Sequence, residues 1–204
     1  MDLDQALPAP MPLEAPMRLE AQPYRDLDAA ERAAGDFLKA LGLEVDTESL
    51  ARTPRRMAEA YAELLTARPF TLTTFPNDEG YDELVIVRGI PIRSVCEHHL
   101  LPFIGVAHVG YLPGDRIVGL SKLARVVELF ARGPQVQERL TKQIADHLDR
   151  KLQPRGVGVV VEAEHLCMTL RGVQATGSRT LTSTLLGLVR TDPRTRSEFL
   201  ELSR

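Results

Sequence analysis

Residues 156–172 read GVGVVVEAEHLCMTLRG, and the small and apolar residues at their start lead directly to a histidine and a cysteine. Side chains of a β-strand alternate between its two faces. The odd-numbered residues from Val157 onward, which are mostly valine and alanine, therefore share one face with His165 and Cys167. This pattern predicts a strand from Val157 to about Thr169 whose buried face ends in these two polar side chains.

On both sides of this strand in the sequence lie other segments in which apolar residues recur every two residues or every three to four residues. Strands are expected over Leu84–Val87, Phe103–Leu112 and Arg179–Val189, and helices over Ser121–Arg132, over Val136–Leu152 and after Asp192-Pro193. Strands in sequential pairs favour antiparallel hairpins with helices on one face, which is an α+β fold. No βαβ alternation and no Gly-x-Gly-x-x-Gly motif is found, so a dinucleotide-binding fold is not expected.

The chain divides into three parts by composition. Residues 1–25 are rich in proline and are expected to form a flexible tail. Residues 26–82 form an N-terminal helical region, with one helix from near Asp28 to Leu41 and a second that begins at Thr53-Pro54. Residues 83–204 form the main domain and carry the residues with chemical potential.

The bulk properties exclude several classes of function. The formal net charge of the 204 residues is -3, which gives no reason to expect nucleic acid or a membrane surface as a partner. No apolar stretch approaches the roughly 20 residues of a membrane span. The N-terminus lacks the basic start and apolar run of a secretory signal, and a cytoplasmic protein is expected.

The chain has two cysteines, and both lie beside histidines. They occur in Cys96-Glu97-His98-His99 and in His165-Leu166-Cys167. A catalytic zinc takes three protein ligands and keeps one position open, so Cys96, His99 and Cys167 would suffice. His98 and His165 would then remain as proton-transfer groups. Spacing alone does not decide between His98 and His99 as the ligand, and a disulfide, two inert thiols or a four-ligand structural zinc are the alternatives.

Two further groups suggest a substrate. Ser121, Lys122 and Arg125 open a predicted helix, where free backbone N–H groups attract anions, and Arg171 follows Cys167 closely. A phosphate-bearing substrate would explain them, whereas a solvated helix face is the simpler alternative. Glu138 in the first turn of the next helix suits the helix dipole, and a carboxylate there would also match the N–H edge of guanine. We expect His108 to be packed in a strand and His147 to be exposed.

These residues and their surroundings strongly resemble type I GTP cyclohydrolase. The matching stretches are SVCEHHLLPF (94–103), GYLPGDRIVGLSKLAR (110–125), PQVQERLTKQ (134–143), GVGVVVEAEHLCMTLRG (156–172) and TLTSTLLG (180–187). The N-terminal helices resemble the family more weakly, through Thr53-Pro54-Arg55-Arg56.

The resemblance implies a tunnelling fold, in which an antiparallel four-stranded sheet carries two helices on one face, with 83–204 as the catalytic domain. It also implies a toroidal homo-oligomer, a decamer, with active sites between subunits. The implied reaction converts GTP and water to formate and 7,8-dihydroneopterin triphosphate, the first step of pterin and folate biosynthesis. Rival hypotheses are another pterin or deazapurine enzyme of the same fold and a non-catalytic scaffold stabilised by zinc.

The resemblance also implies a role for each matching residue. The implied zinc ligands are Cys96, His99 and Cys167; the catalytic residues are His98, His165 and Ser121; the guanine contacts are Glu138 and Gln137; and the triphosphate contacts are Lys122, Arg125, Arg171 and Arg56. We expect zinc to activate water and His165 to protonate the guanine ring. His98 and Ser121 would assist the later opening and rearrangement of the ribose.

Overall fold

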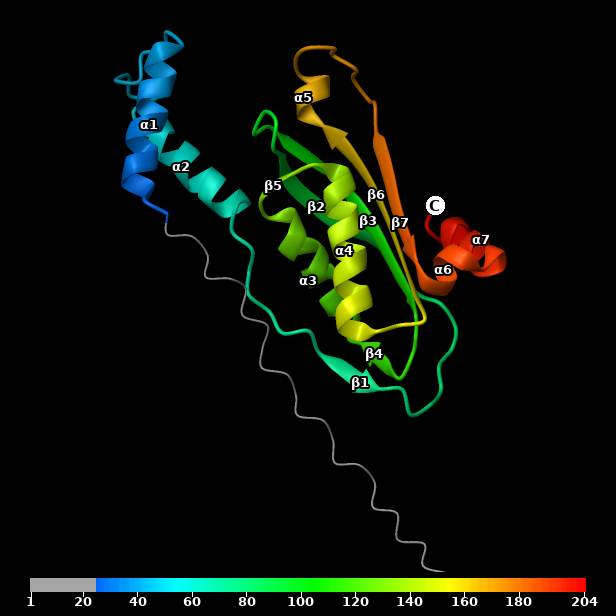
Figure 1. Cartoon of the computed structure of the whole chain (residues 1–204). Coiled ribbons are helices and arrows are strands. Elements are labelled where there is room, and N and C mark those ends of the chain that lie inside the picture. The colour runs from blue at the N-terminus through cyan, green and yellow to red at the C-terminus, as the bar shows by residue number, and fades with distance from the viewer. Residues whose placement is uncertain (1–24) are drawn as a thin grey trace, which may run out of the picture.

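The computed structural model describes residues 25–204, and its centre is a five-stranded sheet in the order β5-β2-β3-β6-β7 (Figure 1). The tail expected over residues 1–25 lies outside the described residues, apart from Arg25. Four long strands run antiparallel, whereas the two-residue strand β5 is parallel to β2. Their bounds are β2 (Val85–Cys96), β3 (Pro102–Leu112), β5 (Pro134–Gln135), β6 (Gly156–His165) and β7 (Thr180–Leu186).

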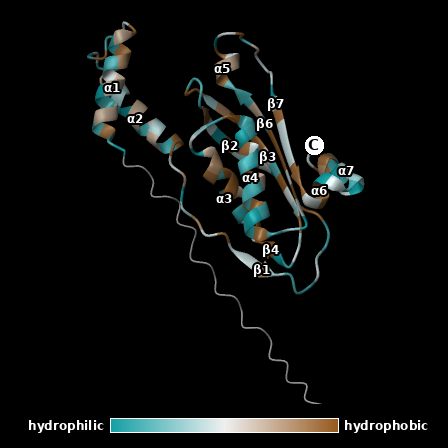
Figure 2. Ribbon diagram, viewed as in Figure 1, coloured by the Kyte–Doolittle hydropathy of each residue, from teal (hydrophilic) through white to brown (hydrophobic). Residues whose placement is uncertain are grey.

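Two long helices cover one face of the sheet, α3 (Leu120–Ala131) and α4 (Gln137–Leu152) (Figure 1). Most of α3 is apolar, whereas α4 is hydrophilic apart from the stripe that it buries (Figure 2). That stripe packs Leu140, Ile144 and Leu148 into the same core as the inward-facing residues of β3 and β6. The four antiparallel strands with two helices on one face confirm the α+β architecture that the resemblance implies.

The opposite face of the sheet is covered at one end by α6 (Gly187–Thr191) and α7 (Pro193–Leu202). Asp192 begins α7 by accepting hydrogen bonds from the backbone N–H groups of Arg194 and Thr195, which confirms the predicted helix start. The expected strand 179–189 ends earlier, because Gly187 adopts φ +55° and opens α6.

The N-terminal helices α1 (Leu27–Ala40) and α2 (Thr53–Leu64) form an antiparallel pair set apart from the sheet (Figure 1). This arm confirms the helical region predicted from the sequence. The chain then forms β1 (Thr74–Pro76), which pairs with β4 (Arg116–Val118) in a small second sheet that the sequence pattern did not predict. Within residues 25–204, no helix combines the length and the apolar character needed to cross a membrane.

Two further expectations from the sequence are wrong. The strand predicted to reach Thr169 stops at His165, and Cys167 lies in the one-turn helix α5 (Leu166–Thr169). The cause is the loss of partner strands, since the last pair with β3 joins Phe103 to His165 and backbone groups beyond it must bond within a helix. His147, expected to be exposed, is only 4% exposed and packs edge-on against Phe130 at 5.4 Å.

Candidate metal centre and active site

Cys96 ends β2 and begins a tight turn that carries the two neighbouring histidines. Leu100 closes the turn with φ 52°, and its N–H donates to the Cys96 carbonyl at 2.8 Å. The Cys96 Sγ lies 3.8 Å from Nδ1 of His98 and 3.9 Å from Nδ1 of His99. The turn therefore presents both imidazoles to one thiol.

Cys167 approaches the same thiol from α5. Ligand atoms of Cys96, His99 and Cys167 all lie within 4.8 Å of one another. Within residues 25–204, these three side chains, hereafter the metal group, are the set that could hold a metal ion. Cys96 is buried, Cys167 is half-buried and His99 is exposed. His98 is not a member of the group, although its ring is equally close to Cys96.

The donor set fits zinc. A tetrahedral zinc with Zn–S of about 2.3 Å and Zn–N of about 2.0 Å would hold its sulfur and nitrogen ligands roughly 3.6 Å apart, close to the spacing of Cys96 and His99. Burial raises the pKa of Cys167, and the adjacent Cys96 raises it further. A cation between the two sulfur atoms would favour the thiolate form, and thiolate with imidazole is the preferred ligand combination of zinc.

His165 lies beside this group at the end of β6. Its ring stacks on Phe103, with centroids 4.6 Å apart and an interplanar angle of 11°. Its Nε2 lies 2.8 Å from Oε1 of Gln137. Burial lowers the pKa of His165, and the carboxylate of Glu138 opposes that shift. A lowered pKa makes the protonated ring a stronger acid.

The first turn of α4 carries Gln137 and Glu138 near His165, and the two side chains differ in exposure. Glu138 is exposed in the first turn. Gln137 is 2% exposed, and its Nε2 donates to the carbonyls of Val161 and Thr180. The amide expected to contact guanine is thus already bonded to the sheet and to His165.

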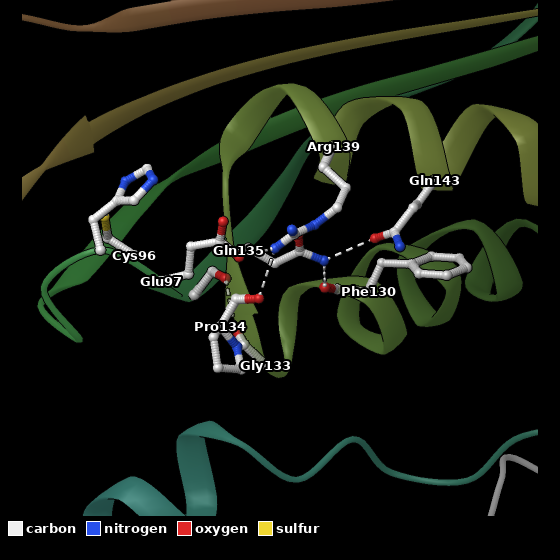
Figure 3. A network of polar contacts seen from close by, with 10 residues as sticks. Cys96, Glu97, Phe130, Gly133, Pro134, Gln135, Arg139 and Gln143 are labelled. Carbon is white, nitrogen blue, oxygen red and sulfur yellow. Dashed lines mark hydrogen bonds and ion pairs between the residues drawn. The ribbon is translucent and has the colours of Figure 1, made fainter.

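An ion pair that the sequence analysis missed joins the turn after Cys96 to the start of α4 (Figure 3). Arg139 donates to the Glu97 carboxylate, to Oε1 of Gln135 at 2.9 Å and to the carbonyl of Pro134 at 3.0 Å. The side-chain hydrogen bond from Arg139 lowers the pKa of Glu97. The two charged residues are 42 positions apart in the sequence, and a local pattern of residues does not indicate a contact over that separation.

Comparison with known proteins decides the family. The family model described as GTP cyclohydrolase I matches residues 30–204. The chain belongs to the GTP cyclohydrolase I family. Curated relatives named GTP cyclohydrolase 1 include that of Mycobacterium tuberculosis, which is 53% identical over 182 residues, 87% of this chain and 90% of the relative. That of Mycobacteroides abscessus is 54% identical over 182 residues, 87% of this chain and 89% of the relative.

Among solved structures, the apo form of the archaeosine synthase QueF-Like has a TM-score of 0.43 and 16% identity, over 51% of this chain and 93% of that one. That likeness is too distant to bear on the site.

A single chain of this GTP cyclohydrolase I family member does not gather all the expected residues. Arg171 follows α5 and lies near enough to influence Cys167 electrostatically. By contrast, Ser121 and Lys122 begin α3, whose other end leads into Pro134, the residue paired with Val95 beside the metal group. The 12-residue helix puts roughly 18 Å between its two ends.

The remaining two basic residues lie on α3 and α2. Arg125 pairs with Glu128 at 3.1 Å on α3. Arg56 is exposed on α2, and that helix is tied to the metal turn by the Tyr61 hydroxyl, which donates to the Leu100 carbonyl at 3.2 Å.

Proposed function

We propose that this chain hydrolyses and rearranges GTP to formate and 7,8-dihydroneopterin triphosphate, the first step of pterin and folate biosynthesis. The observation that carries the proposal is the convergence of Cys96, His99 and Cys167 beside His165, in a member of the GTP cyclohydrolase I family. Metal ligands and a half-buried proton carrier side by side suit a hydrolysis that needs both activated water and an acid.

Cys96, His99 and Cys167 would hold a zinc ion, which supplies a Lewis-acid centre and lowers the pKa of water towards neutrality when bound. The membership of His99 in the compact group favours it over His98 as the ligand. His98 is left free to move protons at the exposed rim of the site.

His165 is proposed to protonate the imidazole ring of guanine, which makes its C8 carbon more electrophilic. The stack on Phe103 and the hydrogen bond to Gln137 hold the ring in a fixed plane while it does so. His98, with Ser121, is proposed to assist the opening of the ribose and the rearrangement that follows.

Guanine recognition is assigned to Glu138, whose exposed carboxylate can accept two hydrogen bonds from the N–H and NH₂ edge of the base. Adenine lacks that edge and would leave the carboxylate unpaired. The Gln137 amide is hydrogen-bonded to the carbonyls of β6 and β7, so it would support the guanine site indirectly. Lys122, Arg125, Arg171 and Arg56 are proposed to bind the triphosphate.

We further propose that the active site is completed by a second copy of the chain in a toroidal homo-oligomer. Lys122 lies at the far end of α3 from the metal group, and a neighbouring subunit would supply the missing cations. Two exposed features suit such packing. Strand β7 forms an edge of the sheet and exposes Leu181 by 67%, and α1 exposes Phe37 by 57%.

The first experiment incubates the full chain with GTP and zinc and measures formate together with the fluorescence of the oxidised pterin. Both products are expected in the wild type and are lost after treatment with a chelator. Cys96→Ser is expected to lose bound zinc and formate release together. Full zinc stoichiometry and turnover in Cys96→Ser would show that the ligand assignment is wrong. A zinc-loaded wild type that makes no formate would favour the scaffold hypothesis.

A further inference from the structure

The side-chain amide of Gln137 can have one orientation in this site. Its Nε2 lies 3.1 Å from the Val161 carbonyl, 2.9 Å from the Thr180 carbonyl and 3.1 Å from the hydroxyl of Thr182. Carbonyl oxygens only accept hydrogen bonds, so the NH₂ group must face them. The reversed amide would place its oxygen against two carbonyl oxygens inside a buried site, where acceptors repel each other and both carbonyls lose their donor.

That orientation determines which hydrogen bond His165 makes. With its NH₂ group turned to the strands, Gln137 presents Oε1 to the Nε2 of His165, 2.8 Å away. An amide oxygen has no proton to give, so Nε2 of His165 must carry the proton that lies between them. The backbone of the β6–β7 pair thereby selects the tautomer of a histidine in the site.

The aromatic stack alone would not make this selection. Phe103 is fully buried and holds the plane of the His165 ring at 11° to its own. A ring turned over by 180° would stack equally well, with Cε1 in the place of Nε2 and Cδ2 in the place of Nδ1. The hydrogen bond to Gln137 distinguishes the two states, because only one of them puts an N–H group opposite Oε1.

We propose that Gln137 is a positioning residue that holds His165 with its proton on Nε2, so that proton transfer to and from the substrate runs through Nδ1. The proposal rests on the proposed function, in which His165 is the acid. In that step Nδ1–H of the protonated ring gives its proton to the guanine ring nitrogen. His165 then remains as the neutral Nε2–H form, still bonded to Gln137.

A spectroscopic experiment tests the positioning without any turnover. Solid-state ¹⁵N spectra are recorded on the zinc-loaded full chain with labelled histidine and without GTP. A His165→Gln sample assigns the His165 signals among the five histidines. We expect Nε2 to be protonated and Nδ1 unprotonated in neutral His165. A proton on Nδ1 of neutral His165 in the wild type would overturn the proposal.

Kinetics separate positioning from direct contact with guanine. In Gln137→Met, of similar shape, kcat is expected to fall by roughly 10²-fold, within the range that a positioned proton carrier contributes, while KM for GTP changes little. Thr141→Val is the matched control, since it removes the hydroxyl bonded to the Gln137 carbonyl and to Thr182 but leaves the contact with His165. Its kcat should stay close to wild type.

The opposite split would also be decisive. A raised KM with an unchanged kcat in Gln137→Met would assign this side chain to guanine binding and overturn the positioning role. A wild type that releases no formate would end the proposed function, while the ¹⁵N spectra would still report which nitrogen of His165 carries the proton.

Discussion

His98 and His99 show how one residue position separates a member of the metal group from its neighbour. Both rings approach Cys96 at nearly the same distance, 3.8 and 3.9 Å, so distance to one thiol does not distinguish them. The second thiol does, because Cys167 completes a compact group with His99. Neither the spacing Cys-x-His-His nor residue type contains this information, since it depends on where α5 brings Cys167.

At Glu138, guanine recognition and helix stabilisation make different predictions. In Glu138→Ala, loss of charged hydrogen bonds to guanine is expected to raise KM for GTP roughly 10- to 100-fold. Glu138→Gln, which keeps one acceptor, should fall between this variant and the wild type. Steady-state kinetics with GTP, together with thermal unfolding of each variant, make the measurement. An unchanged KM with a lowered melting temperature would mean that Glu138 serves only the helix dipole.

Among single residues, the sequence identified the chemical groups better than their surroundings. Cys96 and Cys167 were found from residue type and spacing, and the structure brings them together. Gln137 was expected to face the substrate, yet burial and three hydrogen bonds hold its Nε2 against the sheet. Long-range partners such as Thr180 decide that outcome, and they are not visible in the local pattern of α4.

At the scale of elements, the junction of β6 and α5 places the second half of the metal group. Alternation of apolar side chains extends past the point where the strand ends, because a pattern of side chains does not record whether the backbone still has partners. The one-turn helix changes the direction of Cys167 relative to a strand. Similarly, β1 and β4 were missed because three-residue strands are too short for a period to be recognised.

The packing of α7 on the sheet depends on two glycines. An added Cβ on Gly158 would lie 2.6 Å from Cζ of Phe199, and one on Gly110 would lie 3.0 Å from Cε2 of the same ring. Gly158→Ala is therefore expected to destabilise the protein by about 1–3 kcal/mol, the usual cost of overpacking a core. Thermal unfolding of the zinc-loaded protein measures it, and a lower melting temperature is the expected result.

A matched glycine serves as the control for this variant. Gly133 has no atom within 4 Å of the position that a Cβ would take, so Gly133→Ala should leave the melting temperature unchanged or slightly raised. In a Phe199→Ala background, Gly158→Ala should lower the melting temperature much less than it does in the wild type, because the ring that the new Cβ would meet is gone. Equal effects of Gly158→Ala and Gly133→Ala on the melting temperature of the wild type would contradict the packing argument.

At the scale of the whole molecule, a site shared between subunits makes a strong prediction. His165→Ala and Lys122→Ala subunits should each be inactive alone. If one subunit supplies His165 and its neighbour Lys122, co-expression would form some intact sites, and random mixing predicts about one quarter of wild-type activity. Formate release from oligomers purified through a different tag on each subunit measures this. Activity that stays absent in mixed oligomers would place both residues in a site within one chain.

Cys96 and Cys167 belong to two distant parts of the chain, the end of β2 and the helix α5 after β6. A shared ion would therefore act as a reversible cross-link that closes a long loop, in the manner of a disulfide, and would restrict the unfolded chain. It would also bind the native state alone, which adds stability that grows with free metal concentration. We expect zinc supply to set how long each folded subunit survives as well as how fast it turns over.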